Sequence, residues 1–226
     1  MRRSLSVALA VAWVTACTGA PLAAPPPPAS APTPTESGGY DVIIEGGRIV
    51  DGTGNAWYPG DVGIRGDRIA AITLPGRLRD APAARRVDAT GSVVAPGFID
   101  IQSQSRSNFL AGGDGRVVSK VMMGVTTEIM GESTTNAPSS PAMLAAAGRA
   151  VGVTQFATFG EWMAAMESHG ASVNFGSFVG ASTIRAVGMG QAMGPAGSPE
   201  RRLMQIAVRE SMEDGAFGVA SALIYP

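Results

Sequence analysis

The chain has few of the side chains that most often build metal and disulfide sites. Its 226 residues include one cysteine and one histidine. A disulfide within the chain is excluded, and so is a zinc site made only of its own Cys and His, which needs three or four such ligands. A metal held by this chain alone would need oxygen ligands. Charge of one sign is also lacking, because 17 basic and 18 acidic residues leave −1, and no basic surplus points to nucleic acid.

The first 39 residues are predicted to lie outside the fold. Arg2 and Arg3 precede a short apolar run, which is typical of a secretory signal. The tetrad Val14–Cys17 is similar to a bacterial lipobox, whose cysteine becomes lipidated; ordinary cleavage near Leu22–Ala24 is the alternative. Residues 21–39 are rich in proline and would form an extended tether. We therefore expect a periplasmic protein of the bacterial cell envelope, anchored in the membrane through a lipid on Cys17.

Residues 40–95 carry the pattern of a small β-sandwich or meander. Residues 40–50 read as two strands around a Gly-Gly turn, and residues 61–72 as a hairpin that turns at Gly66-Asp67. Another short strand covers 86–94, with a turn at Thr90-Gly91. Strands this short, separated by frequent turn residues, favour a sandwich.

From residue 96 the pattern changes to alternating strands and helices. Strands are predicted to begin near residues 98, 125, 172 and 216, and helices to cover 117–123, 159–169 and 199–214. This alternation predicts an α/β fold with parallel strands. About four βα units are half of a (β/α)₈ TIM-type barrel, so residues 96–226 are predicted to form an incomplete barrel. The alternative is a four-stranded doubly wound sheet that closes by dimerisation.

Several motifs in fixed order resemble the amidohydrolase superfamily. They are Tyr40–Ile44, Gly46-Gly47, Asp51–Gly54, Asp61–Ile64, Gly66–Ile69, Val94–Asp100 and Gly124–Thr127. Later segments resemble the N-acyl-D-amino-acid deacylase (D-aminoacylase) branch: Val173–Phe175, Val179-Gly180, Met212–Gly218 and Leu223–Pro226. The resemblance covers nearly all of residues 40–226. It implies a β-sandwich beside a TIM barrel, bound zinc or another divalent metal, and hydrolysis of carbon–nitrogen bonds other than peptide bonds.

The chain departs from the family pattern at the positions that usually bind metal. Gln102 and Gln104 stand where the superfamily usually places His-x-His or His-x-Asp after its first barrel strand. Ser133 takes the place of the branch's usual zinc-binding cysteine, and Glu132 precedes it. Ala181 replaces a common histidine after the third strand. The resemblance therefore implies a site whose usual ligands are largely missing.

Glu132 is the best remaining candidate metal ligand, because it follows a barrel strand at its C-terminal end. The alternative is a solvated loop carboxylate. Gln102, Gln104 and Ser133 are candidate substrate-binding residues, the alternative being a vestigial site. Arg185 is placed to bind a substrate carboxylate bidentately, or to form a surface salt bridge. His169 is expected at the opposite end of the barrel, because it ends a helix at a glycine turn on the N-terminal side of the next barrel strand.

These observations leave three functions open. The first is the N-terminal part of a secreted, metal-dependent amidohydrolase that acts on small molecules such as N-acyl amino acids. In it, the metal would activate water, and the remaining ligands would come from later strands, so the chain alone would be inactive. The second is a metal-free ligand-binding lipoprotein of the same fold. The third is a non-functional gene fragment.

Overall fold

The computed structural model describes residues 38–150 and 154–222. Cys17 and the proline-rich segment up to residue 37 lie outside the described residues, so their predicted roles stay predictions. Among the residues that are described, none of the helices combines the length and the apolar character needed to cross a membrane.

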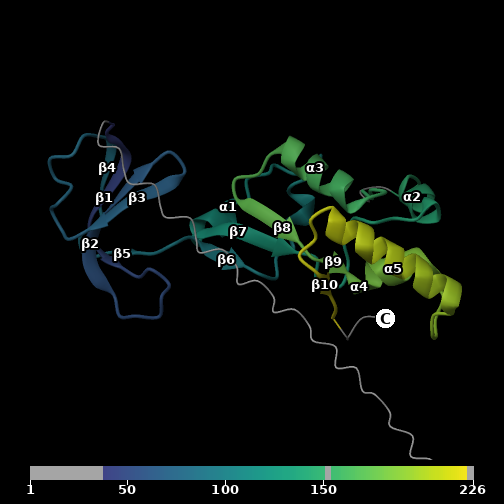
Figure 1. The fold of residues 1–226 in the computed structure, drawn as a ribbon. Helices are drawn as coiled ribbons and strands as arrows, with labels where there is room; N and C mark the ends of the chain where they lie inside the picture. The colour runs from purple at the N-terminus through teal and green to yellow at the C-terminus, as the bar shows by residue number, and fades with distance from the viewer. Residues whose placement is uncertain (1–37, 151–153, 223–226) are drawn as a thin grey trace, which may run out of the picture. The chain divides into compact units, whose positions relative to one another are not determined.

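The described chain divides into two compact units (Figure 1). The first contains Asp61–Asp88 and the described residues up to Glu45, and the second contains Gly46–Gly60 and the chain from Ala89 onward. The predicted division into a β-sandwich part up to residue 95 and a barrel part from residue 96 stays a prediction.

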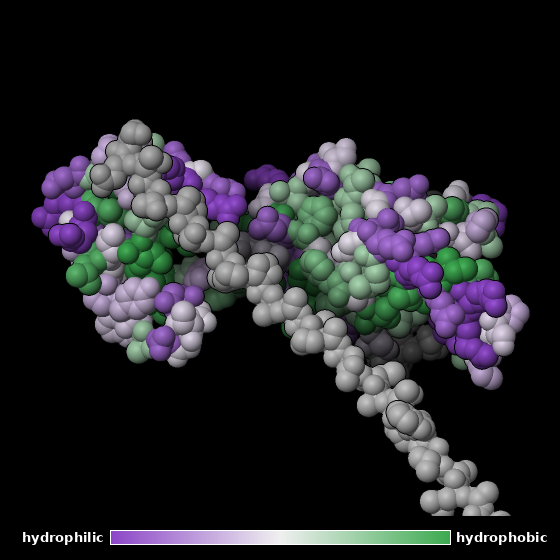
Figure 2. Space-filling model, viewed as in Figure 1, coloured by the Kyte–Doolittle hydropathy of each residue, from purple (hydrophilic) through white to green (hydrophobic). Residues whose placement is uncertain are grey.

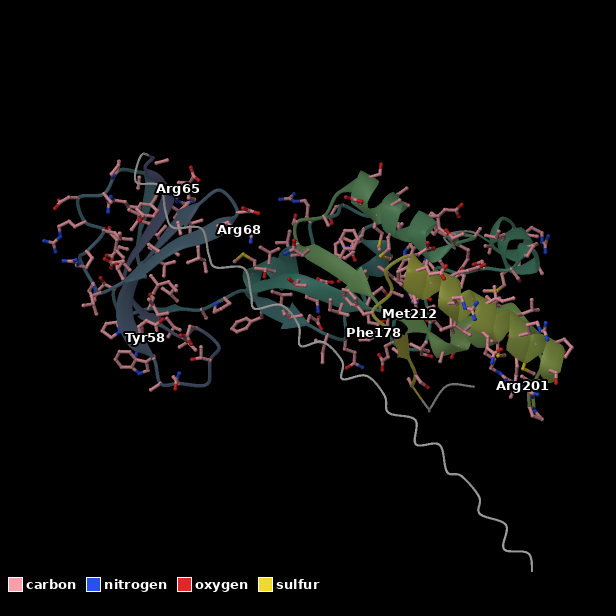
Figure 3. All side chains as sticks on the ribbon, in the orientation of Figure 1. Tyr58, Arg65, Arg68, Phe178, Arg201 and Met212 are labelled. Atoms are coloured by element: carbon pink, nitrogen blue, oxygen red, sulfur yellow. The ribbon has the colours of Figure 1, made fainter. Side chains whose placement is uncertain are left out.

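The N-terminal strands form a mixed five-stranded sheet of order β3-β2-β1-β4, with β5 also paired to β1. The bounds are β1 Tyr40–Ile49, β2 Tyr58–Arg65, β3 Arg68–Thr73, β4 Ala83–Asp88 and β5 Val93–Val94. Strands β2 and β3 are antiparallel, as the predicted hairpin requires, whereas β1 pairs in parallel with β4 and with β5. Figure 3 labels Arg65, whose guanidinium lies 5.1 Å from the centre of the Tyr40 ring.

The predicted Gly-Gly turn within residues 40–50 is wrong, because β1 runs through it as one strand. The two glycines serve other purposes. Gly46 has a φ of 69°, a left-handed conformation that favours glycine. A Cβ on Gly47 would stand 2.4 Å from Val94 Cγ2, so its lack of a side chain permits a close approach of the β5 strand.

The second unit contains the predicted parallel strands. Strands β6 Phe98–Asp100, β7 Val125–Met130 and β8 Asn174–Ser177 form a parallel three-stranded sheet in that order. Strand β9 Val179–Gly180 pairs in parallel with β10 Val219–Ala220. The prediction of an α/β fold with parallel strands, beginning near residues 98, 125, 172 and 216, agrees with these elements.

Three helices lie where the sequence predicts them: α1 Val118–Met122, α3 Phe159–His169 and α5 Ser198–Glu213. The first turn of α3 is fixed by a capping box, in which Thr158 Oγ1 accepts from Glu161 N and the Glu161 carboxylate accepts from Thr158 N. Three further elements were not predicted: the 3₁₀ turn η1 Ser105–Ser107, α2 Pro141–Ala147 and α4 Ala181–Met189.

The core of the second unit lies where helices cover the sheet of β6, β7 and β8. Trp162, Phe159 and Phe109 are fully buried, and Trp162 contacts Phe159 edge-on. Met130 carries this core onto β7. Figure 2 shows the opposite character along α5, whose outer face is hydrophilic. Phe178, labelled in Figure 3, follows β8 and lies edge-on to Phe217 at 6.2 Å, which joins the end of β8 to the segment before β10.

Candidate functional site

The candidate site is built from the segments that follow three parallel strands. Residues 101–106 follow β6, residues 131–135 follow β7, and α4 follows β9 directly. Residues at the carboxyl ends of parallel strands converge on one end of a barrel, where barrel enzymes place their chemistry. The structure brings most of the residues predicted for the site to this end.

The first two segments are joined by hydrogen bonds from two neighbouring side chains, Gln104 and Arg106. Gln104 Nε2 donates to Glu132 Oε2 at 3.3 Å, so two predicted site residues contact each other. Two residues further along each segment, Arg106 Nη1 donates to Thr134 O at 2.6 Å and to Thr134 Oγ1 at 3.2 Å. Gln102 is exposed, and its backbone N–H donates to Asp100 Oδ1 at 3.0 Å.

Ser133 links the second segment to the third. Its backbone has a φ of 63°, and its Oγ lies 2.9 Å from Ser182 Oγ at the start of α4. Ser182 N also donates to Ser133 O at 2.9 Å. The approach depends on Gly180, because a Cβ there would stand 2.2 Å from Ser133 O. Ser133 is buried, so its hydroxyl serves this junction in the structure.

Arg185 lies in α4, three residues after Ser182, and the ion pairs found among the described residues do not include it. Its Nη2 donates to Ala192 O at 3.0 Å and to Gly194 O at 2.9 Å, which ties down the segment after α4. Arg185 lines a cavity of about 300 Å³ together with Thr134 and Ser182. It is therefore on the predicted face, with part of its guanidinium occupied by backbone carbonyls.

Glu128 is a buried carboxyl group to which the sequence assigned no role. It lies within β7 with no exposed surface, and Ser103 Oγ donates to its Oε2. Its Oε1 has no hydrogen-bond partner within the described residues. The signal in the sequence is an acidic residue inside a β-branched strand. The strand pattern does not show which way it faces, and its partner is 25 residues away.

An ion pair between Asp100 and Lys120 joins the end of β6 to α1. The hydrogen bond from Lys120, supported by the Gln102 N–H, holds the pKa of Asp100 below its usual value. The same hydrogen bond raises the pKa of Lys120. Asp100 thus fixes the strand end rather than facing the candidate site. His169 ends α3, where its Nε2 lies 3.2 Å from Gly113 O, and it contacts none of the site residues named above.

The residues of the candidate site do not fit a zinc centre. Zinc in proteins takes three or four ligands from thiolate, imidazole and carboxylate groups. In the part of the chain that the structure describes, no three His, Cys, Asp or Glu side chains are grouped so that they would hold a metal ion. Within residues 101–106 and 131–135, Glu132 is the one carboxylate, and the neighbouring groups are neutral amides and hydroxyls.

Comparison with known proteins identifies homologues. No family model matches the chain. A D-aminoacylase from Alcaligenes xylosoxydans xylosoxydans is 35% identical over 199 residues, which cover 85% of this chain and 40% of the relative. A solved D-aminoacylase, described as defining a novel subset of amidohydrolases, is 34% identical with a TM-score of 0.71 over 83% of this chain. It is covered to 39% of its own length.

An N-acyl-D-glutamate deacylase from Bordetella bronchiseptica, solved with zinc and a phosphonate inhibitor, is 31% identical with a TM-score of 0.72. The match again covers 83% of this chain and 39% of the length of that deacylase. The chain thus spans about two fifths of the length of the relatives it matches. These relatives support a divalent metal in the family. The homologues and structural neighbours of this chain are D-aminoacylase-type amidohydrolases, as the sequence resemblance predicted.

Proposed function

We propose that this chain is the N-terminal part of a secreted, metal-dependent amidohydrolase that hydrolyses the amide bond of N-acyl amino acids. The observation that carries the proposal is the match to a D-aminoacylase at 35% identity over 85% of the chain. Residues 40–95 would form part of the β-sandwich and residues 96–226 the first four βα units of the barrel. The parallel order β6-β7-β8 and the parallel pair β9–β10 support this assignment.

The chain's own residues would bind and orient the substrate. The Glu132 carboxylate and the Gln104 amide lie together at the end of β7 and β6, where they can accept from and donate to a substrate amide. A metal in the family supplies an activated water and polarises the scissile carbonyl. Because the donors present here do not fit zinc, no catalytic step is assigned to a metal on this chain.

The chain alone is therefore expected to be inactive. The test is amine release from a panel of N-acyl-D-amino acids, with zinc, cobalt or manganese added, using the wild type and Glu132→Ala. We expect no release above the rate without protein for either. Metal-dependent release by the wild type that is lost in Glu132→Ala would contradict the proposed inactivity and show that Glu132 supports catalysis.

A metal-free ligand-binding protein of the same fold is the second candidate. Gln102, Gln104, Ser133 and Ala181 favour it, because they stand where the family usually places metal or substrate groups. If the gene encodes a longer protein, that protein should release amine in a metal-dependent reaction under the first proposal. Under the second it should bind the N-acyl amino acid and leave it intact.

We further propose that the protein is held in the bacterial envelope by a lipid on Cys17. The support is the sequence alone: two arginines, a short apolar run and a lipobox-like tetrad that ends at Cys17. The proline-rich residues 21–39 would then separate the folded part from the membrane.

A further inference from the structure

Arg106 is a cation beside the candidate site whose charge has no acidic partner in the described chain. It lies in η1, and Thr134 accepts both of its hydrogen bonds, through Nη1. The ion pairs found among residues 38–150 and 154–222 do not include Arg106. Burial lowers the pKa of its guanidinium, which means that the charge is partly removed from water. A desolvated cation without a counter-ion favours binding of an anion.

Arg106 lies beside a cavity, and the described residues that line this cavity include no acid. It lines a cavity of about 320 Å³ with Thr134, Asn136 and Gln155 among the other lining residues. Thr134, Thr135 and Gln155 also line the 300 Å³ cavity of Arg185, so the two cavities adjoin. No aspartate or glutamate lines either cavity. Threonine hydroxyls and amides can donate further hydrogen bonds to an anion.

The position of Arg106 relative to Glu132 matches the chemistry of an N-acyl amino acid. Two neighbouring contacts join the same two segments, Gln104 with Glu132 and Arg106 with Thr134. Along each segment the two contacts are two residues apart. In an N-acyl amino acid a single carbon separates the carboxylate from the amide N–H. A carboxylate on Arg106 would therefore bring the amide toward Glu132, a hydrogen-bond acceptor. Arg185 suits this role less well, because its hydrogen bonds go to Ala192 O and Gly194 O, whereas those of Arg106 join the same two segments as the Gln104–Glu132 contact.

We propose that Arg106 is the residue that binds the free carboxylate of the ligand, in the cavity formed with Thr134 and Asn136. The proposal rests on the proposed function for the identity of the ligand as an N-acyl amino acid. Its physical basis is the uncompensated guanidinium, whose remaining N–H groups can hold a carboxylate in a fork.

The test is a binding titration of the full chain, without metal, with N-acetyl-D-leucine and with its methyl ester. The ester keeps the acyl and side-chain groups and removes the negative charge. We expect the wild type to bind the free acid and to bind the ester about 10- to 100-fold more weakly, the effect of losing charged hydrogen bonds. Arg106→Gln should bind acid and ester alike, and Arg106→Lys should recover only part of the preference, because lysine lacks the fork.

Arg149→Gln is the matched control, since it removes one positive charge from an exposed position and should leave the preference for the acid unchanged. Circular dichroism would check that the Arg106 variants are folded. The proposal is overturned if folded Arg106→Gln still prefers the acid to the ester, or if Arg106→Lys prefers the acid as strongly as the wild type does. No saturable binding of the acid by the wild type also overturns it. Inorganic phosphate binding as tightly as the acid would overturn the ligand class. Acid binding without hydrolysis by any longer gene product would leave this site standing and refute the proposed hydrolase.

Discussion

The buried pair of Ser103 and Glu128 should contribute strongly to the stability of the strand ends that carry the site. Ser103 is 2% exposed and Glu128 has no exposed surface. Ser103→Ala removes the donor to the Glu128 carboxyl group and also the acceptor of the Ser105 N–H, which lies 3.1 Å from Ser103 Oγ. An intramolecular hydrogen bond contributes about 0.5–1.5 kcal/mol, and a polar group left buried without a partner costs about 1–3 kcal/mol.

We therefore expect Ser103→Ala to lower the free energy of unfolding by about 2–3 kcal/mol. The assay is urea unfolding followed by tryptophan fluorescence, with the slope on urea checked for constancy. Ser107→Ala is the matched control, because Ser107 is exposed in the same segment and should change stability by less than about 0.5 kcal/mol.

A double-mutant cycle with Glu128→Leu tests the pair directly. Removing both polar groups leaves neither one unpaired, so the double variant should be more stable than the sum of the single changes, by about 1–3 kcal/mol. Additive effects, or a Ser103→Ala variant as stable as Ser107→Ala, would refute the reasoning.

Three further results are expected. The pKa of Asp100 is lowered in the folded chain, so its contribution to stability is present above pH about 4 and is lost as pH falls through the folded pKa. The pKa of Lys120 is raised, so its contribution to stability is lost as pH rises beyond about 10.5. In unfolding experiments, the stability of Asp100→Asn should fall less at acid pH than the stability of the wild type. Gly180→Ala should lower the unfolding free energy by about 1–3 kcal/mol or more, measured in urea, because its Cβ meets Ser133 O at 2.2 Å. A fatty-acid analogue should label the wild type in cells and not Cys17→Ser, and equal labelling of both would refute the lipid anchor.

The elements that the sequence predicted correctly carry strong local signals. Helix α3 begins at a capping box of Thr158 and Glu161 and ends before Gly170, so local residues mark both of its ends. Strand β7 is a run of β-branched residues that ends at Gly131. The family resemblance was likewise readable, because its motifs keep their order along the chain and the homologues bear it out.

The elements that were missed depend on contacts with distant residues. Helix α4 has no side-chain N-cap, and Gly180 precedes it because Ser133 approaches closely there, which local patterns do not show. Strand β1 continues through Gly46-Gly47 because Val94 occupies the space beside Gly47. Gln104 was predicted from the family resemblance, and Glu132 from its position after a barrel strand. Arg106 and Glu128 were not, because the sequence does not show that Arg106 is partly buried or that the Glu128 side chain faces the interior.

The affinity of the full chain for zinc tests the central claim most directly, namely that this chain carries the strand ends of a deacylase without a metal centre. Zinc can be titrated at pH 7 against a chromophoric chelator, with the wild type, Glu132→Ala, and a variant in which Gln102 and Gln104 become histidine and Ser133 becomes cysteine. We expect the wild type and Glu132→Ala to bind zinc equally weakly, with a Kd above about 1 μM, and the triple variant to bind more tightly, because it gains imidazole and thiolate ligands. A wild-type Kd well below about 1 μM that rises in Glu132→Ala would contradict the account.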